Sequence, residues 1–216
     1  MDFYLQELNV NDKKDILLNQ FDIIKDRKIL NEKNEELKQK TPLKHFAEEI
    51  QDKIFPSISN VKADILGYFY GEFIKYSGDG QKLGVVLTPK HITELFCDLL
   101  DIKPSDKIFD PCCGTGSFLI AGMNHMIEQV SDEKIKTKIK QNNIHGIESR
   151  EDMFSIATTN MILRGDGKSN LELANFLHKE PKDLRKENYT IGLMNPPYSQ
   201  GGKKAKCTLY NIYLNL

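Results

Sequence analysis

A short motif near the end of the chain, Asn195-Pro196-Pro197-Tyr198, contains groups that could activate a weakly nucleophilic amine. The exocyclic amine of a nucleobase reacts poorly because its lone pair is delocalised into the ring. The side-chain carbonyl of Asn195 and the backbone carbonyl of Pro196 can each accept one amine hydrogen, which favours a pyramidal nitrogen. Proline holds the chain rigid, and Tyr198 could stack on a base rotated out of a duplex. The motif therefore predicts group transfer to a base amine. Taken alone, it is also compatible with a proline-rich turn.

A glycine loop, Asp110–Phe118, lies between a predicted strand and a predicted helix. Gly114 and Gly116 let the backbone approach a ligand closely. In open parallel sheets, ligands bind beyond the carboxyl ends of the strands, where this loop would lie. Asp110 suits a positively charged ligand such as S-adenosylmethionine better than a phosphate. The loop also lacks the lysine that follows the glycines of a phosphate-binding loop.

Glu148 ends the next predicted strand, where a carboxylate could accept both hydrogen bonds of a ribose diol. It follows Gly114 by 148 − 114 = 34 residues, more than the roughly 20 of the dinucleotide-binding pattern. We attribute the excess to the charged segment 131–141, interpreted as a surface connection. Alone, the glycines could form a tight turn and Glu148 could be solvated. Together, in this order, they favour a nucleoside-type pocket.

The first third of the chain is expected to be helical. Residues 1 to about 40 are charged and lysine-rich, with apolar residues at helical spacing and a break at Pro42. A second apolar face predicts a helix over Val61–Tyr76, which ends at a loop with two glycines. We therefore expect a helical N-terminal domain over residues 1–80.

Residues 81–216 alternate strand and helix signals. Thr88 and Pro89 predict a helix start, a capping hydroxyl followed by proline at the first helical position. Strands are expected at 107–110, 144–148, 171–175 and 189–194, and helices at 117–130 and 151–163. Such alternation is typical of α/β proteins, with a parallel sheet covered by helices.

The ordered set Leu87–Lys90, Asp110–Phe118, Glu148 and Asn195–Tyr198 resembles the N6-adenine DNA methyltransferases. It is especially similar to the modification subunits of type I restriction–modification systems and their fused relatives, as is the stretch Asn160–Lys168. The resemblance implies a Rossmann-like methyltransferase sheet, present here in part, after the helical N-terminal domain. It also implies an S-adenosylmethionine cofactor, a DNA adenine target, and specificity and restriction subunits as partners.

The resemblance assigns a role to individual residues, in a direct methyl displacement that needs no metal. Glu148 would hold the cofactor's ribose, and Asn175 would lie near its adenine, where the family often has Asp. The target adenine would be held by Asn195, Pro196, Pro197 and Tyr198. The remaining cofactor-binding residues would be Leu87, Thr88, Pro89, Lys90, Asp110, Gly114, Thr115, Gly116 and Ser117.

Composition limits the other classes. With 39% hydrophobic and 28% charged residues, the chain is globular rather than disordered. Its net charge of −1 lacks the basic excess of a stand-alone DNA binder, so DNA contacts must be local or supplied by partners. The four cysteines and five histidines show no metal-site spacing, and neither a signal peptide nor a membrane span is recognisable. We expect a reduced, cytoplasmic protein.

Only 216 − 198 = 18 residues follow Tyr198, whereas the fold of the resembling family continues through further strands and helices. We therefore expect residues 81–216 to be an incomplete catalytic domain that lacks its C-terminal strands and is inactive alone. Two alternatives remain open. One is a methyltransferase acting on ribosomal RNA or a protein glutamine, and the other is a non-catalytic remnant that binds a partner.

Overall fold

The computed structural model describes residues 27–54, 56, 66–69, 72, 87–165 and 170–196. Contacts divide the chain into two compact units, residues 1–61 and 62–216, which we treat separately. The helix expected over Val61–Tyr76 lies largely outside the described residues, although residues 66–69 and 72 are helical. The domain boundary expected at residue 80 lies outside them too, and it stays a prediction.

In the first unit, the described residues form α3 (Lys28–Asn31), α4 (Pro42–Glu49) and a π-helical turn, η1 (Ile50–Ile54). The break expected at Pro42 is the first residue of α4. The Thr41 hydroxyl accepts a hydrogen bond from the backbone N–H of Lys44, and proline occupies the first helical position.

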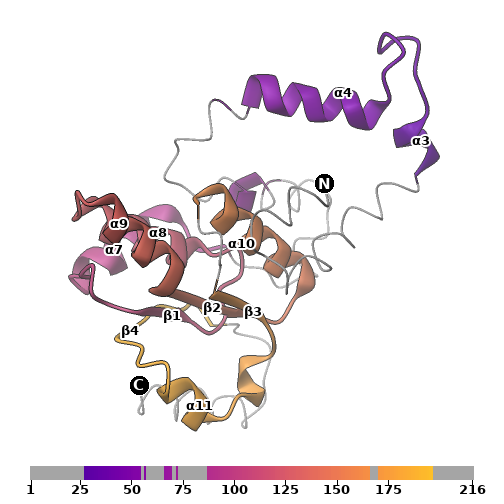
Figure 1. The fold of residues 1–216 in the computed structure, drawn as a ribbon. Helices are drawn as coiled ribbons and strands as arrows, with labels where there is room; N and C mark the ends of the chain where they lie inside the picture. The colour runs from indigo at the N-terminus through magenta and orange to yellow at the C-terminus, as the bar shows by residue number, and fades with distance from the viewer. Residues whose placement is uncertain are drawn as a thin grey trace. The chain divides into compact units, whose positions relative to one another are not determined.

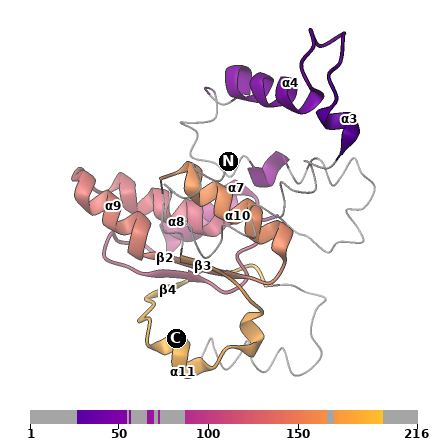
Figure 2. The ribbon, with the colours of Figure 1, turned by 45° about the vertical axis from the view of Figure 1, so that its right-hand side comes forward.

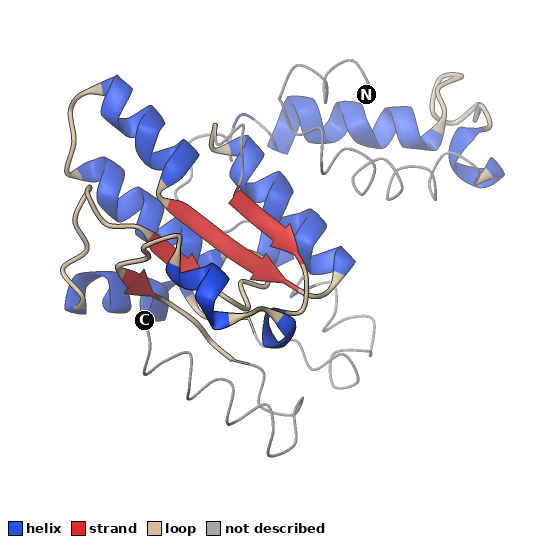
Figure 3. Ribbon diagram, turned by 60° about the horizontal axis from the view of Figure 1, so that its bottom comes forward, coloured by secondary structure: helices blue, strands red, loops and turns tan. Residues whose placement is uncertain are grey.

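The second unit contains a parallel sheet of four strands, β1 (Ile108–Asp110), β2 (Ile144–Glu148), β3 (Asn170–Leu173) and β4 (Ile191–Gly192). Their order is β3-β2-β1-β4, and the strands point the same way (Figure 3). The chain thus runs outward from β1 to β3 and returns to the other side of β1. The connections diverge between β1 and β4, which is where open α/β sheets bind ligands.

Helices cover both faces of this sheet (Figures 1 and 2). One face carries α7 (Lys90–Leu99), α8 (Ser117–Glu128), α9 (Glu133–Asn142) and α10 (Glu151–Leu163). The other carries α11 (Pro181–Arg185) and the 3-10 turn η2 (Phe176–His178), which pack over Phe109 and Ile147. The α/β class with a parallel sheet, predicted from the sequence, is confirmed.

Two glycines let α8 lie close to the sheet. A Cβ atom on Gly122 of α8 would lie 2.4 Å from Cδ1 of Ile108 in β1. One on Gly146 of β2 would lie 2.7 Å from Cδ1 of Leu119 and 3.1 Å from Sγ of Cys113. The close approach brings the start of α8, and hence the glycine loop before it, to the strand ends.

Several element bounds agree with the sequence, and one interpretation was wrong. β2 and α10 have the predicted bounds, whereas the predicted strand at 189–194 contracts to β4. The segment 131–141 is not a plain connection, because it contains α9. Asp132 caps this helix by accepting from the N–H of Lys134, and Ile139 is buried on its inner side.

Candidate functional site

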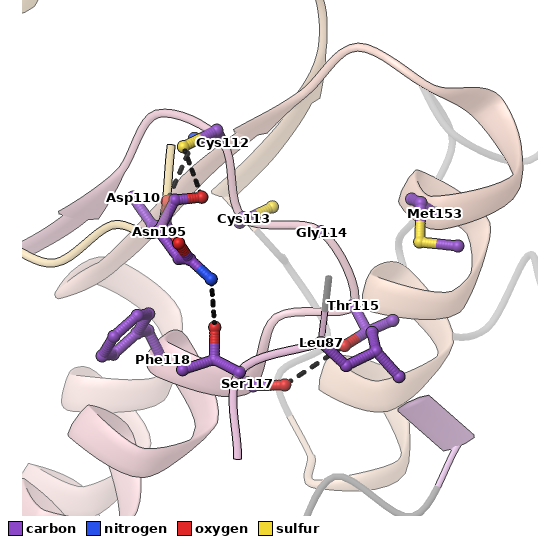
Figure 4. A pocket seen from close by; sticks show the side chains of 11 residues that line it. Leu87, Asp110, Cys112, Cys113, Gly114, Thr115, Ser117, Phe118, Met153 and Asn195 are labelled. Atoms are coloured by element: carbon purple, nitrogen blue, oxygen red, sulfur yellow. Dashed lines mark hydrogen bonds between the residues drawn. The ribbon is translucent and has the colours of Figure 1, made fainter. Parts of the chain in front are cut away.

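A pocket lies at the carboxyl ends of β1 and β4 (Figure 4). Its wall is formed by the glycine loop, the segment before α7, Met153 of α10 and Asn195, which follows β4. The residues that line it are Leu87, Thr88, Asp110, Cys112, Cys113, Gly114, Thr115, Ser117, Phe118, Met153 and Asn195.

The glycine loop takes a backbone conformation that requires its glycines. Gly114 has φ +56° and Gly116 has φ +87°, both in the left-handed region that side chains disfavour. The N–H of Gly116 donates to the carbonyl of Cys113 at 2.8 Å, which closes the turn before α8. No atom lies within 4 Å of where a Cβ atom would project from Gly114, so the loop is open on that side. A ligand could approach the backbone there.

A hydrogen bond from the Asn160 side chain in α10 holds the glycine loop. Its side chain is 1% exposed, and Nδ2 donates to the carbonyl of Thr115 at 3.0 Å. Arg164 donates from Nη1 to the Asn160 backbone carbonyl at 2.7 Å and lies 3.3 Å from Oδ1. Thr115, between the two left-handed glycines, is thereby tied to a helix 45 residues further along the chain.

Asp110 places a buried carboxyl group in the pocket wall. Burial raises the pKa of Asp110, the backbone N–H of Cys112 lowers it by donating to Oδ1, and nearby Glu148 raises it, which together bring the pKa to about 7. The carboxyl is therefore close to half-ionised at neutral pH. A cationic group in the pocket would favour its ionised form.

Glu148 lies at the end of β2, with its carboxylate almost fully buried. Oε2 accepts the N–H of Gly114 at 2.8 Å, and Oε1 accepts the N–H groups of Ser149 and Arg150, each at 2.8 Å. The Ser149 hydroxyl also donates to Oε1 at 3.4 Å. Among the described residues Oε2 accepts only the Gly114 N–H, so this oxygen keeps capacity for one ligand donor. In the described structure Glu148 joins the glycine loop to the end of β2, and it lies just outside the pocket lining.

Asn195 brings the amine motif to the same pocket. Its side-chain Nδ2 donates to Oγ1 of Thr88 at 3.2 Å, and its backbone carbonyl accepts from Sγ of Cys112 at 3.7 Å. Three segments distant in sequence thus meet at one residue. The hydroxyl of Thr88 does not cap α7 as predicted, because Pro89 is the N-cap and no side chain caps that helix.

The two adjacent cysteines are protonated thiols. Burial raises the pKa of both Cys112 and Cys113, and the neighbouring carboxyl groups raise it further. Neither forms a disulfide. A protonated Cys112 can donate the weak S–H hydrogen bond to Asn195.

Not every predicted site residue lines the pocket. Lys90 forms an ion pair with Glu94 at 3.2 Å, and Asn175 is exposed, with Oδ1 accepting the N–H of Leu177 at the start of η2. Pro89, Gly116, Glu148 and Pro196 are also outside the lining, although each adjoins a residue that lines it or bonds to one. Pro197 and Tyr198 lie outside the described residues. The roles assigned to all of these stay predictions.

Sequence reasoning missed other residues at the site. Cys112, Cys113 and Phe118 line the pocket, and Met153 reaches it from the first turn of α10. The loop residues could have been included from their position beside Gly114. Met153 offered no local signal, because α10 reaches the loop only through the tertiary fold. Asn160 begins the stretch Asn160–Lys168 that resembles the family, but the sequence assigned it no contact with the loop.

No described helix is both long enough and apolar enough to span a bilayer. Among the residues whose placement is given, no three His, Cys, Asp or Glu side chains gather as they would around a metal ion.

Comparison with known proteins gives a consistent set of relatives. A family model described as N-6 DNA Methylase matches residues 61–211. The type II restriction enzyme and methyltransferase RM.BcgI of Heyndrickxia coagulans is 50% identical over 186 residues, 85% of this chain and 29% of that protein. The type I restriction enzyme EcoEI methylase subunit of Escherichia coli is 29% identical over 145 residues, 65% of this chain and 29% of that protein. The chain therefore spans less than a third of these relatives.

Solved structures support the fold. A modification subunit of a putative type I restriction enzyme from Vibrio vulnificus YJ016 aligns with a TM-score of 0.54 at 21% identity, over 68% of this chain and 30% of that one. A chain from a study of complex assembly and conformational transition in the type I R-M system aligns with a TM-score of 0.59 at 20% identity, over 76% of this chain and 34% of that one.

Proposed function

The chain belongs to the N-6 DNA methylase family, and on that premise we propose that it carries the cofactor pocket and the target-amine motif of a DNA adenine-N6 methyltransferase from a restriction–modification system. The observation that supports this most is the position of Asn195. Its amide lies in the wall of the pocket formed by the glycine loop, at the divergent strand ends.

The residues present fit S-adenosylmethionine. The open side of Gly114 lets the ligand approach the loop backbone, and Asp110 can balance a positive charge on the ligand. Oε2 of Glu148 has acceptor capacity left for a ribose hydroxyl, and Thr88 and Ser117 add hydroxyl groups to the wall. Leu87 to Lys90 and Gly114 to Ser117 are the segments we assign to the cofactor, with Asn175 as a further candidate at its adenine.

The cofactor, when bound, supplies an electrophilic methyl group on a sulfonium. The chain's own residues prepare the nucleophile. Oδ1 of Asn195 and the carbonyl of Pro196 would accept the two hydrogens of the adenine amine, which localises its lone pair. Pro197 would keep this turn rigid, and Tyr198 would stack on the adenine after it leaves the duplex. The orientation of the amine, rather than proton transfer, is the main contribution of these residues.

DNA is the proposed substrate, and specificity and restriction subunits are the proposed partners. The relatives described above are restriction-system methylases, and the chain spans 29% of the length of each. With a net charge of −1, the chain has no basic excess to bind DNA alone. Partner subunits, or regions present in the longer relatives, would supply the remaining DNA contacts. The proposed location of the protein is the cytoplasm.

Transfer of labelled methyl groups tests this proposal. Unmethylated genomic DNA, ribosomal RNA and a peptide-release factor are offered in parallel to the chain, with and without the partner subunits of its own system. We expect label at N6 of adenine in DNA alone, and its loss in Asn195→Ala. Label on ribosomal RNA or on a glutamine amide would replace the DNA assignment. Absence of label from all three acceptors, with partner binding retained, would favour a non-catalytic binding role.

A further inference from the structure

We propose that Thr88 is a positioning residue that holds the Asn195 side-chain amide in place, with its oxygen available to the target base. The inference rests on the proposed function, because it assigns Asn195 to the base amine. It adds a role for a residue that the sequence interpretation placed at the cofactor and at a helix cap.

The geometry orients the Asn195 amide. Nδ2 donates to Oγ1 of Thr88 at 3.2 Å, across 107 residues of sequence. Figure 4 shows the Asn195 amide in the pocket with its nitrogen on the dashed hydrogen bond. The amide oxygen is therefore directed away from Thr88. Within the described part of the chain, no side chain or backbone group donates to that oxygen, which leaves it available to an amine.

The two orientations of an asparagine amide differ in what they offer to a ligand. In the observed orientation the pocket receives an acceptor, and a base amine is a donor. Turned over, the same side chain would present its NH₂ group to another NH₂ group, and neither could accept. A threonine hydroxyl can accept from the NH₂ group or donate to the oxygen, so the hydrogen bond to Thr88 fixes the position of the amide in the pocket wall. A base amine needs an acceptor and therefore favours the observed orientation.

A second contact fixes the backbone of the same residue. The thiol of Cys112 donates to the carbonyl of Asn195 at 3.7 Å. S–H groups are weak donors, so this contact contributes less than the hydroxyl–amide bond. Cys112 limits where the backbone lies, whereas Thr88 holds the side chain.

The helix that follows Thr88 does not need its hydroxyl. Pro89 is the N-cap of α7, and no side-chain hydrogen bond caps that helix. The nearby Thr93 hydroxyl bonds within its own helix, to the carbonyl of Lys90 at 2.8 Å, and does not line the pocket. Thr93→Val is thus a matched control, because Thr93 is buried in the following helix and its replacement by valine is the same chemical change.

The first experiment measures single-turnover methyl transfer and S-adenosylmethionine affinity in the full chain with its partner subunits. Thr88→Val keeps the shape and removes the hydroxyl. We expect its rate constant to fall about tenfold, the effect of one lost hydrogen bond, while the Kd for the cofactor changes less than about threefold. Thr88→Ser should restore the rate, and Thr93→Val should match wild type. An unchanged rate in Thr88→Val, or a loss confined to cofactor affinity, would overturn the proposal.

The second measurement does not depend on activity. In chain labelled with ¹⁵N-asparagine, the Asn195 amide resonance is identified by its absence from Asn195→Asp. Its NH₂ protons should exchange with water severalfold faster in Thr88→Val than in wild type or Thr88→Ser. Equal exchange in Thr88→Val and wild type would refute the role of Thr88. If wild type transfers no methyl group, the proposed function fails, and this exchange rate still decides whether Thr88 holds the Asn195 amide.

Discussion

At the residue scale, Asp110 places a buried titratable carboxyl group in the pocket wall. Burial raises its carboxyl pKa from 3.8 to about 7. The folded chain thus holds a proton that the unfolded chain has lost between about pH 4 and 7. From this group, the free energy of unfolding therefore decreases as pH rises through that window. A bound cation favours the ionised carboxyl, so cofactor binding should release a proton.

We expect the affinity for S-adenosylmethionine to increase up to about tenfold between pH 5.5 and 7, as the ionised fraction of Asp110 rises. Calorimetric titration over this range measures it. Asp110→Asn removes the titrating group and should make the cofactor affinity nearly independent of pH over this range. A wild-type profile that is already flat would mean that Asp110 does not interact with the charge of the ligand.

We expect Asn160 to affect the affinity for the cofactor without contacting the cofactor. In Asn160→Asp, a carboxylate keeps an acceptor beside Arg164 but has no hydrogen to donate to the Thr115 carbonyl. We expect cofactor affinity to fall about fivefold and the free energy of unfolding to fall by about 1 kcal/mol, the cost of one hydrogen bond. Titration and urea unfolding measure the two quantities. Asn142→Asp, at an exposed position of α9, is the control. Equal cofactor affinities in Asn160→Asp and wild type would show that the glycine loop keeps its conformation without the hydrogen bond from Asn160 to Thr115.

At the element scale, the approach of α8 to the sheet depends on Gly122. Its replacement by Ala would put Cβ 2.4 Å from Cδ1 of Ile108, and overpacking of this kind costs about 1–3 kcal/mol. Ile108→Val removes that Cδ1 atom. We expect the double variant Gly122→Ala/Ile108→Val to be more stable than the sum of the single changes by at least about 1 kcal/mol in urea unfolding. Additive effects would mean that α8 simply shifts away from β1.

The elements differ in how far local sequence determines them. α10 and β2 have the bounds expected from their apolar patterns, since β2 is buried along most of its length and α10 has one buried face. α9 was missed because its charged residues outweigh its apolar ones, and the packing of Ile139 against the sheet unit decides its structure. The predicted cap of α7 was wrong, because the helix begins one residue later, with Pro89 as its N-cap, and the Thr88 hydroxyl accepts from a tertiary partner, Asn195. Local propensity cannot anticipate such a tertiary contact.

At the scale of the whole molecule, motif order predicted which segments would meet but not how they bond. Parallel topology places the ends of β1 and β4 side by side, so the glycine loop and Asn195 had to lie near each other. The bonds of Glu148 to Gly114 and of Asn160 to Thr115 follow only from the packed positions of the helices. The sequence suggested the chemistry of Glu148, whereas its hydrogen bonds to three backbone N–H groups come from the structure.

Calorimetric titration with S-adenosylmethionine measures whether the pocket of this chain binds that cofactor. We expect one site in wild type and at least about tenfold weaker binding in Glu148→Gln, because the amide replaces an acceptor with a donor facing backbone N–H groups. Glu187→Gln, which changes an exposed carboxylate paired with Lys107, should bind as wild type does. A folded wild-type chain that binds no cofactor would rule out the assignment of this pocket to S-adenosylmethionine, and a Glu148→Gln variant that binds as tightly as wild type would rule out the role of Glu148.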